Sequence, residues 1–321
     1  MLHFRGNLDV SAFFAALSRV DDAAECLRLR FVLVDQEPRQ VLAPEPGRDF
    51  GLLDLSLGDD PPAAALAEAQ RLVARPFDLE KGPLHRHRLL RLGPQDHLWV
   101  RVYHHLVFDG FSARLELNHV AAGYAALVRG LPLPELDLPG YCAAWEGPQA
   151  GLASGEQDRA LDYWRQRLAG GGPLCAFSDA PLVSPPGPAS RLDRALPDHL
   201  AAGLSDRARS LGVSLPALLL AAFLLLLGRE SDREHPTCQL ATLGRQGPRQ
   251  RRIPGAFAQV VPFGLDLSGV QGFSELAHQV ASRQRGDYRH GRLTIPEMLQ
   301  AGLDPWRGGP AWGASFNALD F

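Results

Sequence analysis

Hydrophobic positions recur along this chain with two periods, one typical of helices and one typical of strands. Apolar residues three and four positions apart predict amphipathic helices, and alternating or short continuous apolar runs predict strands. In the first half the pattern predicts strands at 2–5, 27–34, 84–92 and 97–103, and helices beginning at Asp9, over 60–75, after Ser112 and over 156–168.

The second half repeats this mixture of elements without repeating the sequence. The most apolar segment, 215–227, contains Pro216 and is too short to span a bilayer, so it predicts a buried core helix. The predicted elements are strands at 190–196, 238–243, 257–267 and 314–321, and helices at 198–211, 214–228 and 273–284.

Glycine and proline mark the best candidate for a domain boundary. Residues 170–173 read GGGP and residues 184–188 read SPPGP, a composition typical of linkers. We therefore predict an N-terminal subdomain over 1–179, a linker over 180–189 and a C-terminal subdomain over 190–321.

Composition and charge exclude several classes of protein. The 321 residues are 45% hydrophobic and 21% charged, which predicts a folded chain, and the formal net charge of −3 argues against nucleic acid or an anionic membrane as a partner. No two of the four cysteines have CxxC spacing. We therefore expect reduced thiols, and neither disulfides nor a structural zinc site. No signal sequence is recognised, which predicts a cytoplasmic protein.

The best candidate for chemistry lies where a predicted strand ends and a helix begins. His104 and His105 end the strand, and Asp109 and Gly110 precede the helix. Histidine exchanges a proton near neutral pH, and adjacent strand side chains point to opposite faces, so we expect His105 alone to face a cleft. The alternative is a structural turn in which Asp-Gly caps the helix.

A metal centre is not predicted. The spacing of His104, His105 and Asp109 does not match a zinc site or a facial triad. No second ligand cluster is recognisable near the other histidines of this region, which are His85, His87 and His97.

Several motifs in order resemble one enzyme family. Residues 104–110 match HHxxxDG, the motif of the condensation domains of nonribosomal peptide synthetases, which belong to the superfamily that resembles chloramphenicol acetyltransferase. Residues 27–31 resemble the LRxRF strand of that family, residues 75–84 its RPFDLxxGPL segment and residues 163–168 its YWxxxL helix.

The second half continues the resemblance with two departures. Residues 215–228 resemble the LLAAFxxLL helix, residues 244–245 the GR turn and residues 254–264 the GxFxNxxPxR motif, with Gln259 in place of Asn and Gly264 in place of Arg. Gly264 and residues 289–292 (RHGR) resemble the subgroup that includes the serine-activating subunit of enterobactin synthase, which implies a siderophore pathway. Domains of this family begin one helix earlier and continue beyond residue 321, so we expect a fragment that lacks both ends.

The resemblance implies a fold and a reaction. The expected fold is α/β, with two chloramphenicol acetyltransferase-like subdomains, each an α+β two-layer sandwich, that form a V around a tunnel. Two peptidyl or aryl carrier proteins would deliver substrates on phosphopantetheine, and the acceptor amine would attack the donor thioester to form an amide. No cofactor bound directly, a monomer and an adjacent adenylation domain are also expected.

The resemblance also implies roles for individual residues. His105 would handle the proton or stabilise the tetrahedral intermediate, with His104 as its neighbour in the motif, and Asp109 would pair with Arg28. Gly110 would allow close approach to substrate because it has no Cβ. Ser112 would be an N-cap or touch the pantetheine arm, and Gln259 and Asn317 would line the tunnel.

Three other functions remain compatible with the sequence. A free-standing acyltransferase that uses coenzyme A needs only the HxxxD core formed by His105 and Asp109. An epimerisation domain also carries HHxxxDG. A truncated, non-catalytic module that binds a carrier protein is the third alternative.

Overall fold

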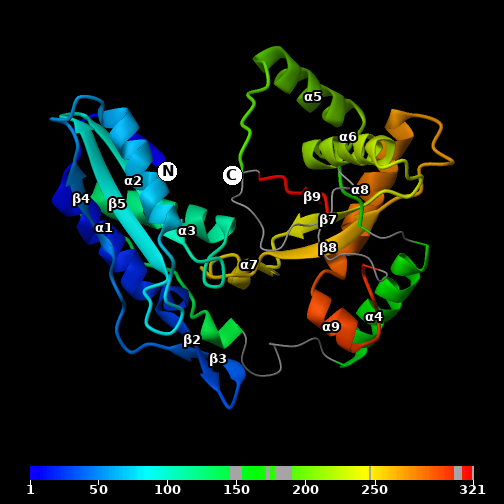
Figure 1. Cartoon of the computed structure of the whole chain (residues 1–321), viewed down its shortest axis with the longest axis horizontal. Coiled ribbons are helices and arrows are strands. Elements are labelled where there is room, and N and C mark those ends of the chain that lie inside the picture. Colours follow the sequence, from blue (N-terminus) through cyan, green and yellow to red (C-terminus); the bar gives the residue numbers. More distant parts are fainter. Residues whose placement is uncertain (145–153, 171–173, 178–189, 246, 307–312, 320–321) are drawn as a thin grey trace. The chain divides into compact units, whose positions relative to one another are not determined.

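The fold is taken from a computed structural model, which describes residues 1–144, 154–170, 174–177, 190–245, 247–306 and 313–319. Contacts divide the chain into two compact units (Figure 1). Unit 1 contains the described residues up to Ala144 and the segment Arg245–Phe257, and unit 2 contains the remainder. The sequence predicted two halves separated at 180–189. That linker lies outside the described residues, and the contacts assign Arg245–Phe257 to the first unit.

Unit 1 is built on a four-stranded mixed sheet. Its strands are β1 (Leu2–Arg5), β4 (Phe50–Asp54), β5 (His85–Gly93) and β6 (Asp96–Tyr103), in the order β1-β6-β5-β4. β5 and β6 form the predicted antiparallel hairpin, in which His85 pairs with Tyr103, whereas β4 is parallel to β5. A separate antiparallel pair joins β2 (Leu29–Val34) to β3 (Glu37–Leu42).

Helices cover both faces of this sheet. Leu89 of β5 packs in a cluster with α1 (Val10–Ala23) and α3 (Gly110–Val128), whereas Leu90 packs in a cluster with α2 (Pro61–Ala74). Successive strand side chains point to opposite faces, so a strand that is apolar on both faces requires two covering layers. Unit 1 therefore has three layers, not the expected two.

Carboxylate caps explain why two helices of unit 1 begin where the sequence predicts. The side chain of Asp9 accepts a hydrogen bond from the Ala12 backbone N–H at 2.9 Å, and that of Asp60 accepts one from Ala63 at 3.0 Å. Such caps satisfy backbone donors that have no partner within the helix.

Small and polar residues form much of the buried face of α3. Ser112, Glu116 and Gly123 are buried, whereas Ala121 and Val128 are exposed. A Cβ added at Gly123 would lie 3.4 Å from the Cβ of Ala16 on α1. The two helices therefore approach along small side chains, which rotates the larger apolar residues partly outward.

Unit 2 surrounds a three-stranded sheet in the order β8-β7-β9. β7 (Thr237–Thr242) is antiparallel to β8 (Gln259–Gly264) and parallel to β9 (Ser315–Phe316). One hydrophobic core joins the sheet to its helices. These helices are α4 (Ser154–Ala169), α5 (Asp198–Ser210), α6 (Leu215–Glu230), α8 (Phe273–Arg289) and α9 (Ile295–Gln300).

α6 confirms the predicted core helix. Leu220, Leu224 and Leu227 are fully buried, although Leu225 and Leu226 are 40% and 50% exposed. Among the described residues no single helix has the length and apolar character to cross a membrane. α5 and α6 meet this test only as a pair, with a bend of 102° between them.

Other differences from the predicted elements lie in weakly patterned segments. Residues 190–196 form no strand, and their side chains are exposed. β3, β4, α9 and the short helix α7 (Gly247–Gln250) were not predicted, and 3-10 helices occupy Glu25–Arg28 and Cys142–Ala144. β3 contains a proline and has no buried residue, so its hydrophobic pattern does not predict a strand.

Candidate functional site

The two adjacent histidines occupy a turn at the end of β6. The backbone N–H of His104 donates to the Leu84 carbonyl at 2.9 Å, and the His104 carbonyl accepts from the N–H of Val107 at 3.1 Å, which closes the turn. Nδ1 of His104 accepts from the Leu106 N–H at 3.2 Å, and the ring lies 5.9 Å from that of Phe77. His104 is half-buried and fixed by these contacts, whereas His105 is exposed.

Asp109 follows this turn as the N-cap of α3 and is held by a buried guanidinium. Nη1 of Arg245 lies 2.5 Å from Oδ2 of Asp109, and Nη2 lies 3.1 Å from Oδ1, so the pair is bidentate. Oδ2 also accepts from the Phe257 backbone N–H at 3.0 Å, and Oδ1 caps α3 by accepting from the Ser112 N–H at 2.9 Å. One carboxylate thus joins the turn, the helix and the segment Arg245–Phe257 within unit 1.

Ser112 is buried and hydrogen-bonded to several residues, and it is not the N-cap of α3. Asp109 takes the cap position, and the Ser112 hydroxyl lies 2.8 Å from Oδ1 of Asp109 and 2.9 Å from the Gly255 carbonyl, either of which can accept its proton. The same oxygen accepts from the Gly255 N–H and from Nη2 of Arg245, both at 2.8 Å. A fully buried hydroxyl with these partners is not exposed to a pantetheine arm, so both expected roles are wrong.

Aromatic rings and one glycine complete the packing around Arg245. The guanidinium carbon lies 4.8 Å from the ring centroid of Phe111 and 4.5 Å from that of Phe257, within the range of cation–π attraction. Gly255 has φ +158, and a Cβ there would lie 2.2 Å from two ring carbons of Tyr141. Only glycine therefore fits between Arg245 and Tyr141.

The environment of Asp109 favours its charged form. Burial raises the pKa of this carboxyl, but hydrogen bonds and charge from Arg245 and hydrogen bonds from Ser112 outweigh burial and lower the pKa below the ordinary value of 3.8. Asp109 is therefore ionised at neutral pH. The buried ion pair therefore fixes the residues that precede α3 to the segment Arg245–Phe257.

The expected pairing of Asp109 with Arg28 is wrong. Nη1 of Arg28 instead donates to the carbonyls of Ala43 and Pro44, at 3.5 and 3.3 Å. Arg28 is the last residue of the 3-10 helix before β2, and its two acceptors come directly after β3. The GR turn at 244–245 was the one signal for Arg245 in the sequence, and no role was assigned to it.

The three remaining predicted site residues lie in both units, Gly110 in unit 1 and Gln259 and Asn317 in unit 2. Gly110 is the first residue of α3 and is exposed. Gln259 begins β8, and its Oε1 is buried without a hydrogen-bond partner among the described residues. Asn317 follows β9 and is exposed. Both belong to unit 2, so their role in a tunnel shared with His105 stays a prediction.

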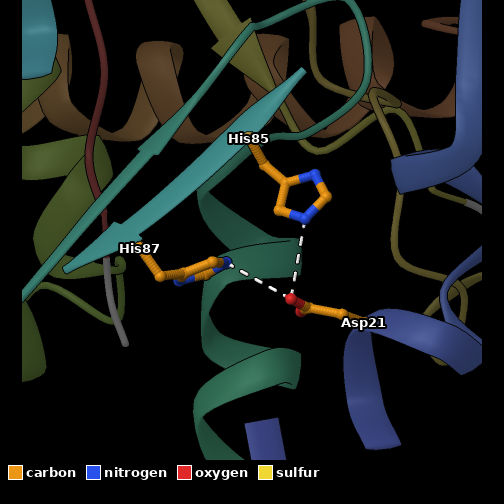
Figure 2. Close-up of side chains that lie close together, drawn as sticks. All are labelled: Asp21, His85 and His87. Atoms are coloured by element: carbon orange, nitrogen blue, oxygen red, sulfur yellow. Dashed lines mark ion pairs between the residues drawn. The ribbon is translucent and has the colours of Figure 1, made fainter. Parts of the chain in front are cut away.

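A second polar group lies inside unit 1, where no ligand cluster was expected near His85, His87 or His97. His85 and His87 on β5 both point toward Asp21 on α1 (Figure 2). Nε2 of each histidine lies 3.6 Å from Oδ2 of Asp21, and Nε2 of His87 lies 3.9 Å from Oε1 of Glu116 on α3. The signal available was the HRH sequence, because residues two apart on a strand share a face. The partner from α1 could not be read from it.

Burial dominates the electrostatics of this group. It lowers the pKa of His87 to about 4, against the opposing charge of Asp21, so the ring is neutral at pH 7. Burial and the charge of Asp21 raise the pKa of Glu116 to about 7, although Arg101 acts in the other direction.

Comparison with known proteins finds related sequences along almost the whole chain. Residues 1–307 match the condensation domain family. The isonitrile lipopeptide synthase of Streptomyces coeruleorubidus is 29% identical over 92% of this chain and 20% of its own length. The chondramide synthase of Chondromyces crocatus is 34% identical over 92% of this chain and 8% of its own length. The chain thus spans a small part of these curated relatives.

Solved structures agree with the fold. The first condensation domain of the calcium-dependent antibiotic synthetase, in complex with a substrate analogue, has a TM-score of 0.84 at 23% identity and covers 100% of this chain and 74% of that one. A mutant of the starter condensation domain of rhizomide synthetase, in complex with C8-CoA and Leu-SNAC, has a TM-score of 0.82 at 27% identity and covers 94% and 68%. With its HHxxxDG turn and a family match that spans residues 1–307, this chain belongs to the condensation domain family.

Proposed function

We propose that this chain forms an amide bond between a donor acyl or peptidyl thioester and the amine of an acceptor aminoacyl thioester. Both substrates would be carried on the phosphopantetheine arms of carrier proteins. The proposal rests on the membership of the condensation domain family and on one geometric observation. His105 is exposed in the turn that follows β6, and Asp109, two residues beyond that turn, is fixed by the buried Arg245.

In the proposed reaction the acceptor nitrogen attacks the donor carbonyl carbon. The C–N bond forms, the C–S bond breaks, and the donor phosphopantetheine leaves as a thiol. Orientation of two tethered substrates contributes about 7–11 kcal/mol to such reactions, and proton transfer by a positioned side chain adds roughly 10²–10⁴-fold. His105 either accepts the proton of the attacking nitrogen or hydrogen-bonds the tetrahedral intermediate. Asp109 and His104 hold the turn that carries it.

The finer parts of the sequence-based expectation belong to this proposal. They are a tunnel between two chloramphenicol acetyltransferase-like subdomains, substrate contacts of Gln259 and Asn317, an adjacent adenylation domain, a monomeric state and a cytoplasmic location. Aryl or peptidyl carrier proteins are the expected partners.

The siderophore subgroup finds no support in the names of the reported relatives, and its two signals have structural explanations. A Cβ at Gly264 would lie 2.5 Å from Oγ1 of Thr237, so no side chain fits there. In the RHGR segment, the His290 carbonyl accepts from Nε1 of Trp164 at 3.0 Å, and the His290 ring stacks on Tyr163 at 4.2 Å. Packing within unit 2 accounts for these residues without a particular product.

A second candidate donor is an acyl-coenzyme A thioester. The rhizomide starter domain, which is 27% identical to this chain, was solved with C8-CoA. If this chain begins a peptide, a CoA-bound fatty acyl group would replace the donor carrier protein, while the acceptor and the role of His105 would stay the same.

The test is a condensation assay with His105→Ala and His105→Gln. Donor octanoyl groups would be supplied on a carrier protein and, separately, on CoA, with an aminoacyl carrier protein as acceptor, and amide product would be measured by mass spectrometry. The control is His199→Ala, an exposed histidine on α5. We expect loss of at least 100-fold in rate for both His105 variants and full rate for the control.

Equal rates for His105→Ala and wild type would remove this residue from the mechanism. Product from octanoyl-CoA alone would assign the chain as a starter domain. Binding of carrier proteins without product from either donor would favour the non-catalytic alternative.

A further inference from the structure

Three elements of unit 1, namely α1, β5 and α3, bring metal-binding side chains together. Asp21, His85 and His87, here named the α1–β5 cluster, each offer one donor atom, and these three atoms lie within 4.8 Å of one another (Figure 2). Glu116 on α3 adds a second carboxylate, with Oε1 at 3.9 Å from Nε2 of His87. Two imidazoles and two carboxylates form a donor set that suits a divalent transition metal.

The donor atoms are buried and lack other partners. Asp21, His85, His87 and Glu116 are each at most 2% exposed. Among the described residues, neither oxygen of Asp21, neither ring nitrogen of His85 or His87, nor Oε1 of Glu116 has a hydrogen-bond partner. Buried polar side chains are normally paired, so a group of this many unpaired atoms requires a reason.

The charges of the group are unbalanced. Oε2 of Glu116 is compensated, because it accepts hydrogen bonds from Nη1 of Arg101 at 2.9 Å and from the Tyr103 hydroxyl at 2.5 Å. Among the described residues, the ion pairs of Asp21 are with the two imidazoles. A buried carboxylate without a cation is costly, and a metal ion at the point where the donor atoms converge would supply the missing positive charge.

The distances leave room for an ion of the right size. A tetrahedral zinc ion with bonds of about 2.0–2.1 Å separates its ligand atoms by about 3.3 Å. Both histidine nitrogens lie 3.6 Å from Oδ2 of Asp21. We propose that the α1–β5 cluster binds one zinc ion through Asp21, His85 and His87, and that the Glu116 side chain moves closer on binding to supply the fourth ligand.

The burial of every ligand indicates a structural metal, because a catalytic zinc ion keeps one position open to solvent or substrate. Such an ion would join α1, β5 and α3. His85 pairs with Tyr103, the last residue of β6, and His104 bonds to Leu84 next to His85. The zinc ion would therefore stabilise the base of the turn that presents His105, without contact with substrate.

The experiment measures zinc binding by the full 321-residue chain, independently of its activity. The protein is purified with a chelator, dialysed, and titrated with zinc against a chromogenic competitor, and bound metal is counted by mass spectrometry. We expect one zinc ion per chain, at least a tenfold loss of affinity in Asp21→Asn and His87→Gln, and unchanged affinity in His97→Gln. His97 is a buried histidine on β6 outside the cluster.

Cobalt substitution of the wild-type chain gives a second test that needs no variant to fold. Tetrahedral cobalt with nitrogen and oxygen ligands should give visible d–d bands without the charge-transfer band of a thiolate, which would indicate a cysteine such as Cys26 instead. A folded wild-type chain that binds no zinc, a cobalt spectrum with thiolate ligands, or a folded Asp21→Asn chain with wild-type affinity would each overturn the proposal.

Discussion

Oδ2 of Asp109 lies 2.5 Å from Nη1 of Arg245, a residue 136 positions later in the sequence. This contact joins the last part of the HHxxxDG turn to the segment Arg245–Phe257, which returns to unit 1 from the second half of the chain. The position of His105 thus depends on a residue remote in sequence. Both partners are buried, so under the proposed function they would act on catalysis by positioning this segment.

Removal of Arg245 should destabilise unit 1 strongly. In Arg245→Gln the buried Asp109 loses its cation, and breaking a buried ion pair from one side costs about 3–5 kcal/mol. We expect a fall of this size in the free energy of unfolding, measured by urea titration with circular dichroism. The control is Arg209→Gln, whose exposed partner Asp206 lies in the same helix, with an expected change below about 0.5 kcal/mol.

The double variant Asp109→Asn with Arg245→Gln separates pairing from packing. It contains no uncompensated charge, so it should recover part of the stability lost in Arg245→Gln. If both single variants unfold at the same urea concentration as wild type, the pair has no structural role.

The lowered pKa of Asp109 predicts a dependence of stability on acid pH. The folded pKa lies below the ordinary value of 3.8, so the unfolded chain binds the proton more readily. The stabilisation is complete above the unfolded pKa and is lost as pH falls through the folded pKa. Between pH 5 and pH 2, the unfolding free energy of wild type should fall more steeply than that of Asp109→Asn. Parallel curves over this range would contradict the assignment.

The sequence identified the chemistry of the Asp109 contact but not its partner. The resemblance to the condensation domains implied an arginine partner for Asp109, with Arg28 as the candidate. Which one arrives depends on how the second half returns to unit 1, and local periodicity contains no information on that path. Tertiary packing, not local pattern, selected Arg245 over Arg28.

Elements with their own local signals were predicted more reliably. α1 and α2 begin after Asp9 and Asp60, which supply caps within three residues. The strand expected at 190–196 failed because a strand needs a partner, and none pairs with it among the described residues. The α1–β5 cluster was missed for the same reason as Arg245, since Asp21 joins His85 and His87 only through the packing of α1 on the sheet.

Substitution of Gly255 should disturb the same network by a steric route. A Cβ at this position would lie 2.2 Å from the Tyr141 ring, and φ +158 is unfavourable for other residues. We expect Gly255→Ala to lower the unfolding free energy by about 1–3 kcal/mol. Gly269→Ala is the control, because nothing lies within 4 Å of a Cβ there and it lacks a positive φ.

Adding Tyr141→Leu to Gly255→Ala tests the source of that loss. Leucine removes the ring atoms that a Cβ at residue 255 would meet. Tyr141→Leu should therefore lower the unfolding free energy less in the Gly255→Ala chain than in the wild-type chain. Additive effects would show that backbone strain, and not the ring, is responsible.

Tyr163 of the YWxxxL helix should stabilise unit 2 through a buried carboxylate. Its hydroxyl donates to Oδ1 of Asp287 at 2.6 Å, and Nε of Arg167 donates to the same oxygen at 2.9 Å. Asp287 is fully buried, so Tyr163→Phe removes a donor that solvent cannot replace, which costs about 1–3 kcal/mol.

The matched control is Tyr288→Phe, since the Tyr288 hydroxyl accepts from Nε2 of Gln284 and the residue is 46% exposed. That bond joins two neutral groups and not a buried charge, so we expect a smaller change, of about 0.5–1 kcal/mol. Thermal unfolding of both variants checks the comparison. An equal or larger loss in Tyr288→Phe than in Tyr163→Phe would contradict the stabilising role assigned to the Tyr163 hydroxyl.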